Sequence, residues 1–312
     1  MAANIVAVGF EASDAFVAAL PKAELHVHLE GTIDGETARM LAPDEHLSYE
    51  FSNFDGFLRC FKSAVTLLRT PDDYALVTRR LIAKLAAQNV RYAEITLAGG
   101  VVLWKGLDFG AVYDAVAAEC RRAEFPVWLI VDAVRHFGLE HVWKVARLAV
   151  ERAGDRVVAF GIGGDESRGP AGQFVEVFEF VKSKGLCLIP HAGEMAGADS
   201  VRVCMEMGAF RIGHGVRAIE DEGLLAELRS RGVPLEVCIS SNVATGAVVC
   251  MDAHPVRRLY DAGVPITLHT DDPAIFNTSL NAEYGIAAKC FAFTCAELEE
   301  IAANGFRYAC RP

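Results

Sequence analysis

The chain has 312 residues, of which 52% are hydrophobic and 23% are charged. This composition excludes a disordered protein and is sufficient for a large buried core. The formal net charge of −11 argues against a nucleic-acid-binding surface, because acidic side chains repel phosphates. No apolar run approaches the roughly 18 residues that a membrane-spanning helix needs. We therefore expect a small-molecule partner, no nucleic acid and no membrane.

Nine cysteines are scattered along the chain, and no two of them form a Cys-x-x-Cys pair. Neither a disulfide framework nor a thiolate metal site is therefore expected. The first 16 residues lack the basic region and the long apolar run of a signal peptide. These features predict a cytoplasmic protein and leave its oligomeric state open.

Short β-rich runs alternate with longer amphipathic stretches along almost the whole chain. Strands are expected over residues 24–28, 90–96, 127–134, 157–164, 187–191, 211–214, 234–240 and 265–269. Helices are expected over residues 74–88, 111–123, 139–153, 174–184, 224–231 and 255–262. Repeated strand–helix units over roughly 250 residues predict an α/β fold, a (β/α)8 TIM barrel. An open doubly wound sheet is disfavoured, because no glycine-rich nucleotide fingerprint follows the first strand.

Two segments are too long for simple connections. Residues 32–89 predict a helical insertion after strand 1, and the helix-like spacing of its phenylalanines between residues 51 and 61 is typical of a core. Residues 280–306 predict extra C-terminal helices. No linker or internal repeat interrupts the pattern, so residues 1–312 are expected to form a single domain.

Barrel enzymes place their catalytic groups at the C-terminal ends of the strands. The first strand ends in His26 and His28, whose side chains point to the same side because they are two residues apart. The fifth strand ends in His191, and the eighth is followed by Asp271 and Asp272. Two adjacent carboxylates repel each other, and a divalent cation resolves the conflict. Three imidazoles and one carboxylate suit zinc, with a position left for water.

Two further polar residues follow strands five and six. Glu194 lies on the turn after His191, and His214 is flanked by glycines that leave room for a ligand. Zinc lowers the pKa of a bound water to about 7, and Glu194 can then shuttle protons. His214 and Asp272 can orient the attacking group and stabilise the intermediate. The spacing predicts metal-assisted hydrolysis and leaves ester, amide, phosphotriester and amidine substrates open.

Several stretches together resemble the adenosine deaminase family, namely residues 20–32 (LPKAELHVHLEGT), 191–194 (HAGE), 211–215 (RIGHG), 241–242 (SN) with 245–246 (TG), and 270–273 (TDDP). The resemblance implies a (β/α)8 barrel with one zinc ion per chain, held by His26, His28, His191 and Asp271. It also implies that adenosine or 2′-deoxyadenosine loses its 6-amino group as ammonia and becomes an inosine.

The resemblance also implies roles for the residues around the metal. Glu194 matches the proton donor to purine N1, and His214 matches the residue that orients the hydroxide. Asp272 matches the acceptor of the N7 hydrogen bond, and the backbone N–H of Gly164 would meet N3. Glu30 stands where adenosine deaminases often have an aspartate that contacts the ribose. Adenine-deaminase-like relatives have a glutamate at this position.

Position 30 leaves the sugar open, because a longer carboxylate there could compensate for an absent ribose or meet a modified one. One alternative is a deaminase of a 5′-modified adenosine such as aminodeoxyfutalosine, in the menaquinone pathway. The glycine-rich turn after strand four and the following Arg168 resemble that branch of the family. Another alternative is an adenine deaminase, although the run at residues 241–246 looks closer to nucleoside deaminases.

Two rival functions make different demands on the sequence. Two-metal lactonases and phosphotriesterases commonly have a bridging lysine at the end of strand four, where this chain has Gly163, Gly164 and Asp165. A purine sensor without catalysis predicts a broken catalytic set, whereas every matching position here is filled. The remaining polar residues are assigned to caps, the surface and solvated loops: His136, His141, His254 and Arg168.

Overall fold

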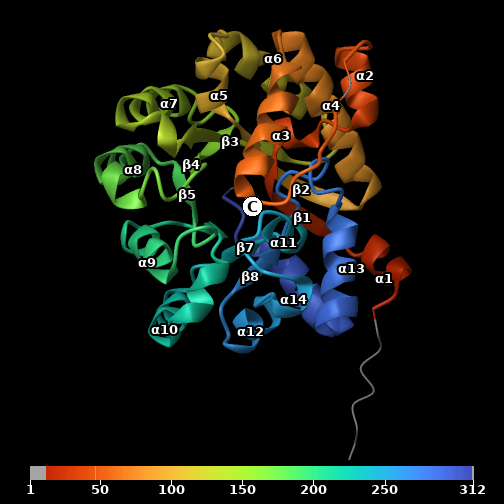
Figure 1. Cartoon of the computed structure of the whole chain (residues 1–312), viewed down its shortest axis with the longest axis vertical. Coiled ribbons are helices and arrows are strands. Elements are labelled where there is room, and N and C mark those ends of the chain that lie inside the picture. Colours follow the sequence, from red (N-terminus) through yellow and green to blue (C-terminus); the bar gives the residue numbers. More distant parts are fainter. Residues whose placement is uncertain (1–11, 46, 311–312) are drawn as a thin grey trace, which may run out of the picture.

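The computed structural model describes residues 12–45 and 47–310. Its centre is a sheet in which eight strands pair in sequence order, each parallel to the next. The strands are β1 (Lys22–His28), β2 (Val90–Leu97), β3 (Val127–Val134), β4 (Val157–Gly163), β5 (Cys187–Ala192), β6 (Ile212–His214), β7 (Leu235–Val237) and β8 (Ile266–Leu268). Helices surround the sheet (Figure 1), so the predicted (β/α)8 barrel is confirmed.

The barrel closes between β1 and the chain that follows β8. Val27 and Asp271 form a parallel bridge at this seam. The His28 N–H donates to the Asp271 carbonyl at 2.8 Å, and the Asp271 N–H donates to the His26 carbonyl at 2.9 Å. The same contact therefore closes the sheet and brings Asp271 beside two histidines of β1.

The α-helices of the described residues connect or flank the strands. They are α1 (Asp14–Ala19), α2 (Gly35–Leu41), α3 (Phe54–Thr66), α4 (Pro71–Ala87), α5 (Gly99–Trp104), α6 (Phe109–Arg122), α7 (Leu139–Glu151), α8 (Val175–Ser183), α9 (Ala198–Glu206), α10 (Glu222–Arg231), α11 (Ile239–Ala244), α12 (Val256–Asp261), α13 (Leu280–Phe291) and α14 (Cys295–Arg307). Helices α2 to α4 form the predicted insertion, and α13 and α14 are the predicted C-terminal helices. None of the helices in the described ranges is long and apolar enough to span a membrane.

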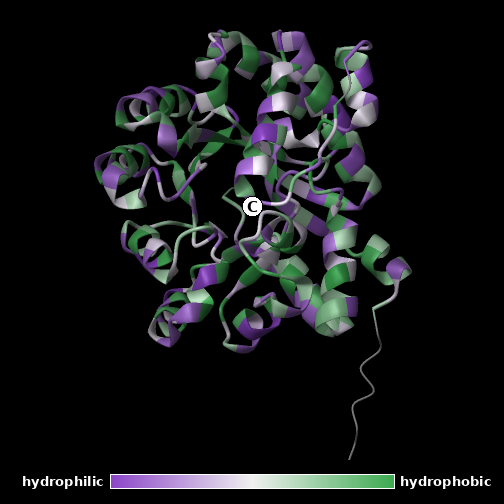
Figure 2. Ribbon diagram, viewed as in Figure 1, coloured by the Kyte–Doolittle hydropathy of each residue, from purple (hydrophilic) through white to green (hydrophobic). Residues whose placement is uncertain are grey.

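The helices begin, pack and end as their sequences dictate. Helix α4 starts with a capping box, in which the Thr70 side chain accepts the Asp73 N–H and the Asp73 side chain accepts the Thr70 N–H. Its apolar residues, such as Leu81, are buried. Helix α10 ends at Gly232, whose φ of 66° favours glycine. Hydrophilic and hydrophobic residues alternate along the outer helices (Figure 2), as expected for helices with one face on a barrel.

Strand seven is shorter than predicted. The sequence predicted a strand over residues 234–240, whereas β7 ends at Val237 and α11 begins at Ile239. This part of the prediction was wrong because tertiary contacts override the β-branched pattern. The Ser241 hydroxyl donates to Asp271 at 2.6 Å, and the Asn242 amide nitrogen lies 3.0 Å from His214. The helical turn thus directs both side chains toward the expected active site.

Candidate active site

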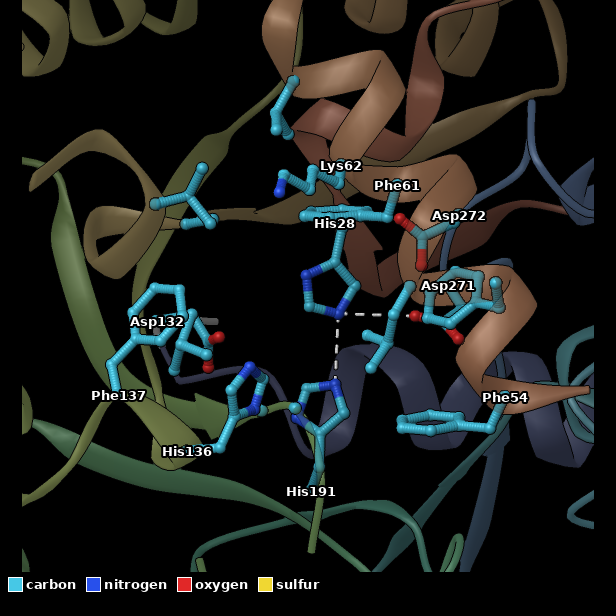
Figure 3. Close-up of a pocket in the computed structure, with 18 of the residues that line it drawn as sticks. His28, Phe54, Phe61, Lys62, Asp132, His136, Phe137, His191, Asp271 and Asp272 are labelled. Carbon is cyan, nitrogen blue, oxygen red and sulfur yellow. Dashed lines mark hydrogen bonds and ion pairs between the residues drawn. The ribbon is translucent and has the colours of Figure 1, made fainter. Parts of the chain in front are cut away.

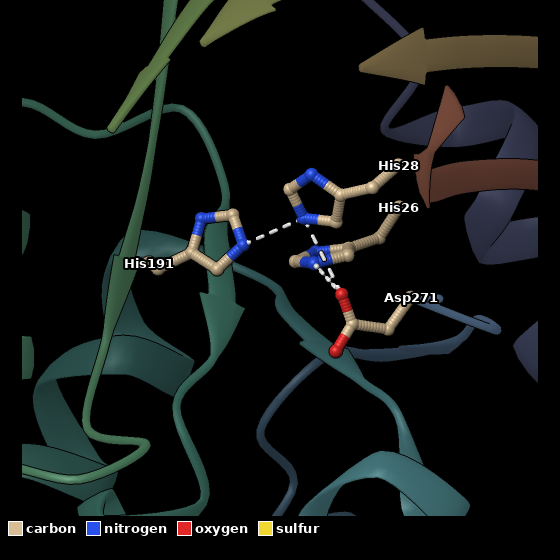
Figure 4. Close-up of side chains that lie close together, drawn as sticks. All are labelled: His26, His28, His191 and Asp271. Atoms are coloured by element: carbon tan, nitrogen blue, oxygen red, sulfur yellow. Dashed lines mark hydrogen bonds and ion pairs between the residues drawn. The ribbon is translucent and has the colours of Figure 1, made fainter. Parts of the chain in front are cut away.

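Four buried side chains meet at the C-terminal end of the barrel (Figure 4). They are the predicted ligands His26, His28, His191 and Asp271, and one ligand atom from each lies within 4.8 Å of the others. His28 Nε2 lies 3.1 Å from His191 Nε2 and 3.3 Å from Asp271 Oδ1. His26 Nε2 lies 3.4 Å from the same carboxylate oxygen. Segments far apart in the sequence therefore bring their donor atoms to one point.

The donor atoms of this cluster fit a metal ion. His26 Nδ1 lies 2.7 Å from Glu236 Oε2, so the proton of a neutral His26 faces that carboxylate. His26 Nε2 is then left as a buried lone pair that faces the Asp271 carboxylate oxygen at 3.4 Å and receives no hydrogen bond, which is rare unless a ligand fills the space between such acceptors. A carboxylate behind a ligating imidazole is a regular feature of metal sites. The cluster is therefore a candidate metal centre.

His26 is held in place by a buried network of ion pairs. Arg211 donates to Glu236 and to Glu94, and all three side chains are buried. Burial alone would raise the pKa of Glu236, but Arg211 and His26 lower it to about 2. Glu236 is therefore an anion that orients His26. Neither glutamate was predicted as a site residue, because the only signal of each was an acidic residue inside a predicted strand.

Two further catalytic candidates lie beside the candidate metal centre. Burial, with Asp271 and Glu166 nearby, raises the pKa of Glu194 well above its usual value, which favours the protonated form that a proton donor needs. His214 Nε2 lies 3.7 Å from Glu194 Oε2 and 3.9 Å from Asp271 Oδ2. His214 and Asp271 both have positive φ, 60° and 63°, an uncommon backbone state that concentrates at functional sites.

Of the three residues predicted to contact the substrate, Asp272 and Gly164 line the pocket and Glu30 does not. Asp272 lines the pocket, and a Cβ at Gly31 would lie 1.8 Å from its Oδ1, so only glycine fits at position 31. Gly164 lines the same pocket. Glu30 is fully buried, accepts the Ala98 N–H at 3.1 Å and is not one of the lining residues. Burial raises the pKa of Glu30 to about 7, and its role in substrate recognition stays a prediction.

Glu166 holds the turn that carries Glu194, and the sequence analysis gave it no role. Its buried carboxylate accepts four hydrogen bonds of 2.6 to 3.0 Å, from the N–H groups of Gly193, Met195 and Ala196 and from the hydroxyl of Ser200. An anion with this many donors fixes the turn firmly. The partners lie 27 to 34 residues further along the chain, so local pattern could not reveal them.

A pocket of about 420 Å³ opens above the metal centre (Figure 3), a size typical of small-molecule sites. Its inner end is formed by His28, His191, Glu194, His214, Asp271 and Asp272. Phe54, Phe57 and Phe61 of α3 form part of its wall. Phe57 is also packed in a small apolar cluster. The aromatic insertion, predicted as core, therefore also lines the site.

The outer end of the pocket carries two exposed cations, an exposed tryptophan and two half-buried aromatic rings. Lys62 Nζ lies 5.4 Å from the centre of the Trp104 ring, Trp104 stacks on Phe137 at 6.3 Å, and Phe137 meets His136 edge-on at 5.1 Å. Arg168 lines the same pocket, and burial together with Arg168 lowers the pKa of His136. We call these five residues the mouth cluster. His136 and Arg168, assigned from sequence to the surface and to a solvated loop, both line the pocket.

Asp132 is a further pocket residue that the sequence analysis missed. It lies on β3, is 4% exposed, and lines the pocket beside the metal centre (Figure 3). Burial raises the pKa of this carboxyl group to about 8. A Cβ at Gly161 would lie 2.6 Å from Asp132 Oδ1, so the neighbouring strand makes room for it. The only sequence signal was one acidic residue in the apolar run 127–134.

Comparisons with known proteins agree with this site. Residues 21–312 match the family described as adenosine deaminase. The aminodeoxyfutalosine deaminase of Streptomyces coelicolor is 39% identical, over 93% of this chain and 80% of that protein. The adenine deaminase of Sinorhizobium fredii is 36% identical, over 90% of this chain and 91% of that protein.

A solved structure extends the comparison to the fold. The adenine deaminase of Arthrobacter aurescens superposes with a TM-score of 0.87 at 27% identity, over 93% of this chain and 94% of that one. Sequence, fold and site geometry thus point to the same family. The chain belongs to the adenosine deaminase family of hydrolytic deaminases.

Proposed function

We propose that this protein is a zinc-dependent deaminase of an adenine nucleoside that carries a large 5′-substituent. Aminodeoxyfutalosine is such a nucleoside, and relatives named for it, from two Streptomyces species, are 39% and 40% identical to this chain. The observation that carries the proposal is the extent of the pocket, which continues from the metal centre to the mouth cluster.

The inner end of the pocket supplies the chemistry. Zinc, held by the three histidines and Asp271, would activate a water molecule for attack on C6. Glu194 gives its proton to purine N1, which makes C6 more electrophilic. Burial and Asp271 raise the pKa of Asp272 well above its usual value, which favours its protonated form. A protonated Asp272 would donate to N7, whose lone pair can only accept, whereas the resemblance implied Asp272 as the acceptor.

The mouth cluster suits an aromatic substituent with a negative charge. Trp104 is 49% exposed and offers a flat ring face with Lys62 beside it. The acidic residues that line the pocket are all buried: Asp132, Glu194, Asp271 and Asp272. The exposed charges that line it, Lys62 and Arg168, are therefore positive in a chain whose net charge is −11. Cations next to aromatic rings favour an anionic aromatic group.

Unmodified adenosine, the substrate expected first from sequence, has less support. The relatives at 39% and 40% identity carry the name aminodeoxyfutalosine deaminase. Adenosine would also leave the mouth cluster without a partner. This counts against adenosine, because an exposed apolar patch at the rim of a pocket often marks a ligand-binding site.

Adenine is the second candidate. Relatives named adenine deaminases are 36% identical to this chain over 90% of its length. Glu30 also fits the pattern of adenine-deaminase-like proteins. A free base would use the inner end of the pocket alone.

A panel of five substrates separates these possibilities by ammonia release: aminodeoxyfutalosine, 5′-methylthioadenosine, adenosine, 2′-deoxyadenosine and adenine. We expect the highest kcat/KM for aminodeoxyfutalosine. Preference for adenine would replace the proposal with the second candidate. Release of no ammonia from any of the five by metal-loaded protein would contradict both.

A further inference from the structure

We propose that a backbone amide sets the position of the proton on His214, acting through the side chains of His254 and Asn242. These groups form one chain of hydrogen bonds that runs from the start of α12 to the pocket. In the resulting arrangement His214 Nε2 carries the proton and faces the reacting groups. This inference goes beyond the proposed function, because it assigns positioning residues and a direction of proton donation whichever purine is bound.

The chain starts at Val256, the first residue of α12. Its N–H donates to His254 Nδ1 at 3.1 Å. A backbone N–H can only donate, so Nδ1 of His254 must be unprotonated. His254 is 4% exposed and therefore neutral, since burial lowers its pKa to about 3. A neutral ring with a bare Nδ1 has its proton on Nε2. The prediction of a surface position for His254 is wrong, because the residue is buried, whereas its predicted role as a cap is confirmed, because it accepts the first N–H of α12.

His254 orients Asn242, which in turn orients His214. The Nε2–H of His254 donates to Asn242 Oδ1 at 3.2 Å, so the amide nitrogen of Asn242 faces His214 Nδ1 at 3.0 Å. Rotating the amide by half a turn would bring two N–H groups together at His254. Because an amide nitrogen only donates, Nδ1 of His214 accepts, and the proton of this neutral ring is on Nε2.

The position of this proton decides whether His214 donates or accepts a hydrogen bond in the pocket. Its Nε2 lies 3.7 Å from Glu194 Oε2 and 3.9 Å from Asp271 Oδ2. With a proton there, His214 donates a hydrogen bond to an oxygen in the pocket and cannot take a proton from the attacking water. Asn242 and His254 do not line the pocket, so they act through His214.

Two substitutions of His254 form a matched pair. In His254→Gln the side-chain amide can still donate to Asn242 and accept from Val256, so the arrangement survives. In His254→Leu the donor is lost, and the Asn242 amide is free to rotate and turn its oxygen to His214. We expect the leucine variant to lose about 10- to 100-fold in kcat with little change in KM, while the glutamine variant keeps most of its kcat.

Asn242→Asp is the stronger test, because a carboxylate offers only acceptors. It should transfer the proton to His214 Nδ1 and lower kcat on the order of 10²-fold or more, with unchanged metal content. Wild-type kcat in this variant would overturn the inference.

The proton position can also be read without any substrate. In ¹⁵N-histidine NMR of the metal-free and zinc-loaded protein, with His214→Asn used to assign the signals, we expect the proton on Nε2 in wild type and His254→Gln. We expect it on Nδ1 in Asn242→Asp. A wild-type His214 protonated on Nδ1 would overturn the inference even if the proposed substrate were correct. Failure of the substrate panel would leave this result unaffected.

Discussion

The two ends of the pocket are built differently. At the inner end, the metal-ligand candidates and Glu194 are at most 9% exposed, and fixed groups such as Glu166 and Glu236 hold them in place. At the mouth, Trp104 is 49% exposed, and Lys62 is also exposed. Reaction chemistry needs side chains held in place by supporting hydrogen bonds, whereas substrate choice can rest on residues that adapt to a bound group.

The largest effect is expected from removing a metal ligand. Asp271→Ala should lose the metal and all measurable turnover, because the remaining imidazoles no longer complete the ligand set. Elemental analysis should find about one zinc ion per wild-type chain. Two metal ions per chain would instead indicate a two-metal hydrolase, and full occupancy in the variant would remove Asp271 from the ligands.

Glu194→Gln should abolish most of the turnover and leave the structure of the inner end of the pocket unchanged. The glutamine has the same size but cannot deliver a proton, so kcat should fall about 10²- to 10⁴-fold while metal content is unchanged. Glu283→Gln is the matched control, because Glu283 is also fully buried, has a pKa raised to about 7, and lies outside the pocket lining. Turnover near wild type in Glu194→Gln would exclude the proposed proton donor.

Glu166→Gln tests whether the immobility of the inner end matters for catalysis. The glutamine would turn an N–H toward backbone donors, loosen the Glu194 turn, and lower kcat about 10- to 100-fold. Ser200→Ala removes only one of the four hydrogen bonds and should cost less. If Glu166→Gln lowers Tm but leaves kcat unchanged, Glu166 serves stability alone.

The smallest effects are expected at the mouth. Lys62→Ala and Arg168→Ala should each raise KM about 3- to 10-fold for 5′-(3-carboxybenzylthio)-5′-deoxyadenosine, because each removes a charge that faces the carboxylate. The neutral 5′-benzylthio analogue should be unaffected in the same kinetic assay. Equal losses on both substrates would mean that these cations do not recognise the substituent.

Much of this site could be predicted from sequence, because its signals are local. The spacing of His26 and His28 on one strand, and the pair Asp271–Asp272 after another, follow from strand geometry and charge repulsion. The barrel followed from the alternation of strand and helix patterns, and the structure confirms it.

The groups that support the site could not be predicted, because their partners are distant in sequence. Glu236 meets His26 across 210 residues, and Glu166 meets the turn after β5 across 27 residues or more. The predicted end of strand seven was wrong for the same reason. Distant contacts made by α11 outweigh the β-branched composition of residues 234–240.

The seam between β1 and the segment after β8 has a consequence for how the protein matures. Asp271 meets His26 and His28 only when the end of the barrel reaches its beginning, a contact that spans more than 240 residues. Contacts of such long sequence separation form late in folding, because closing a large loop costs entropy. We therefore expect a metal ion to meet all four candidate ligands only in the completed barrel, because a partly folded chain does not yet hold Asp271 beside the two histidines of β1.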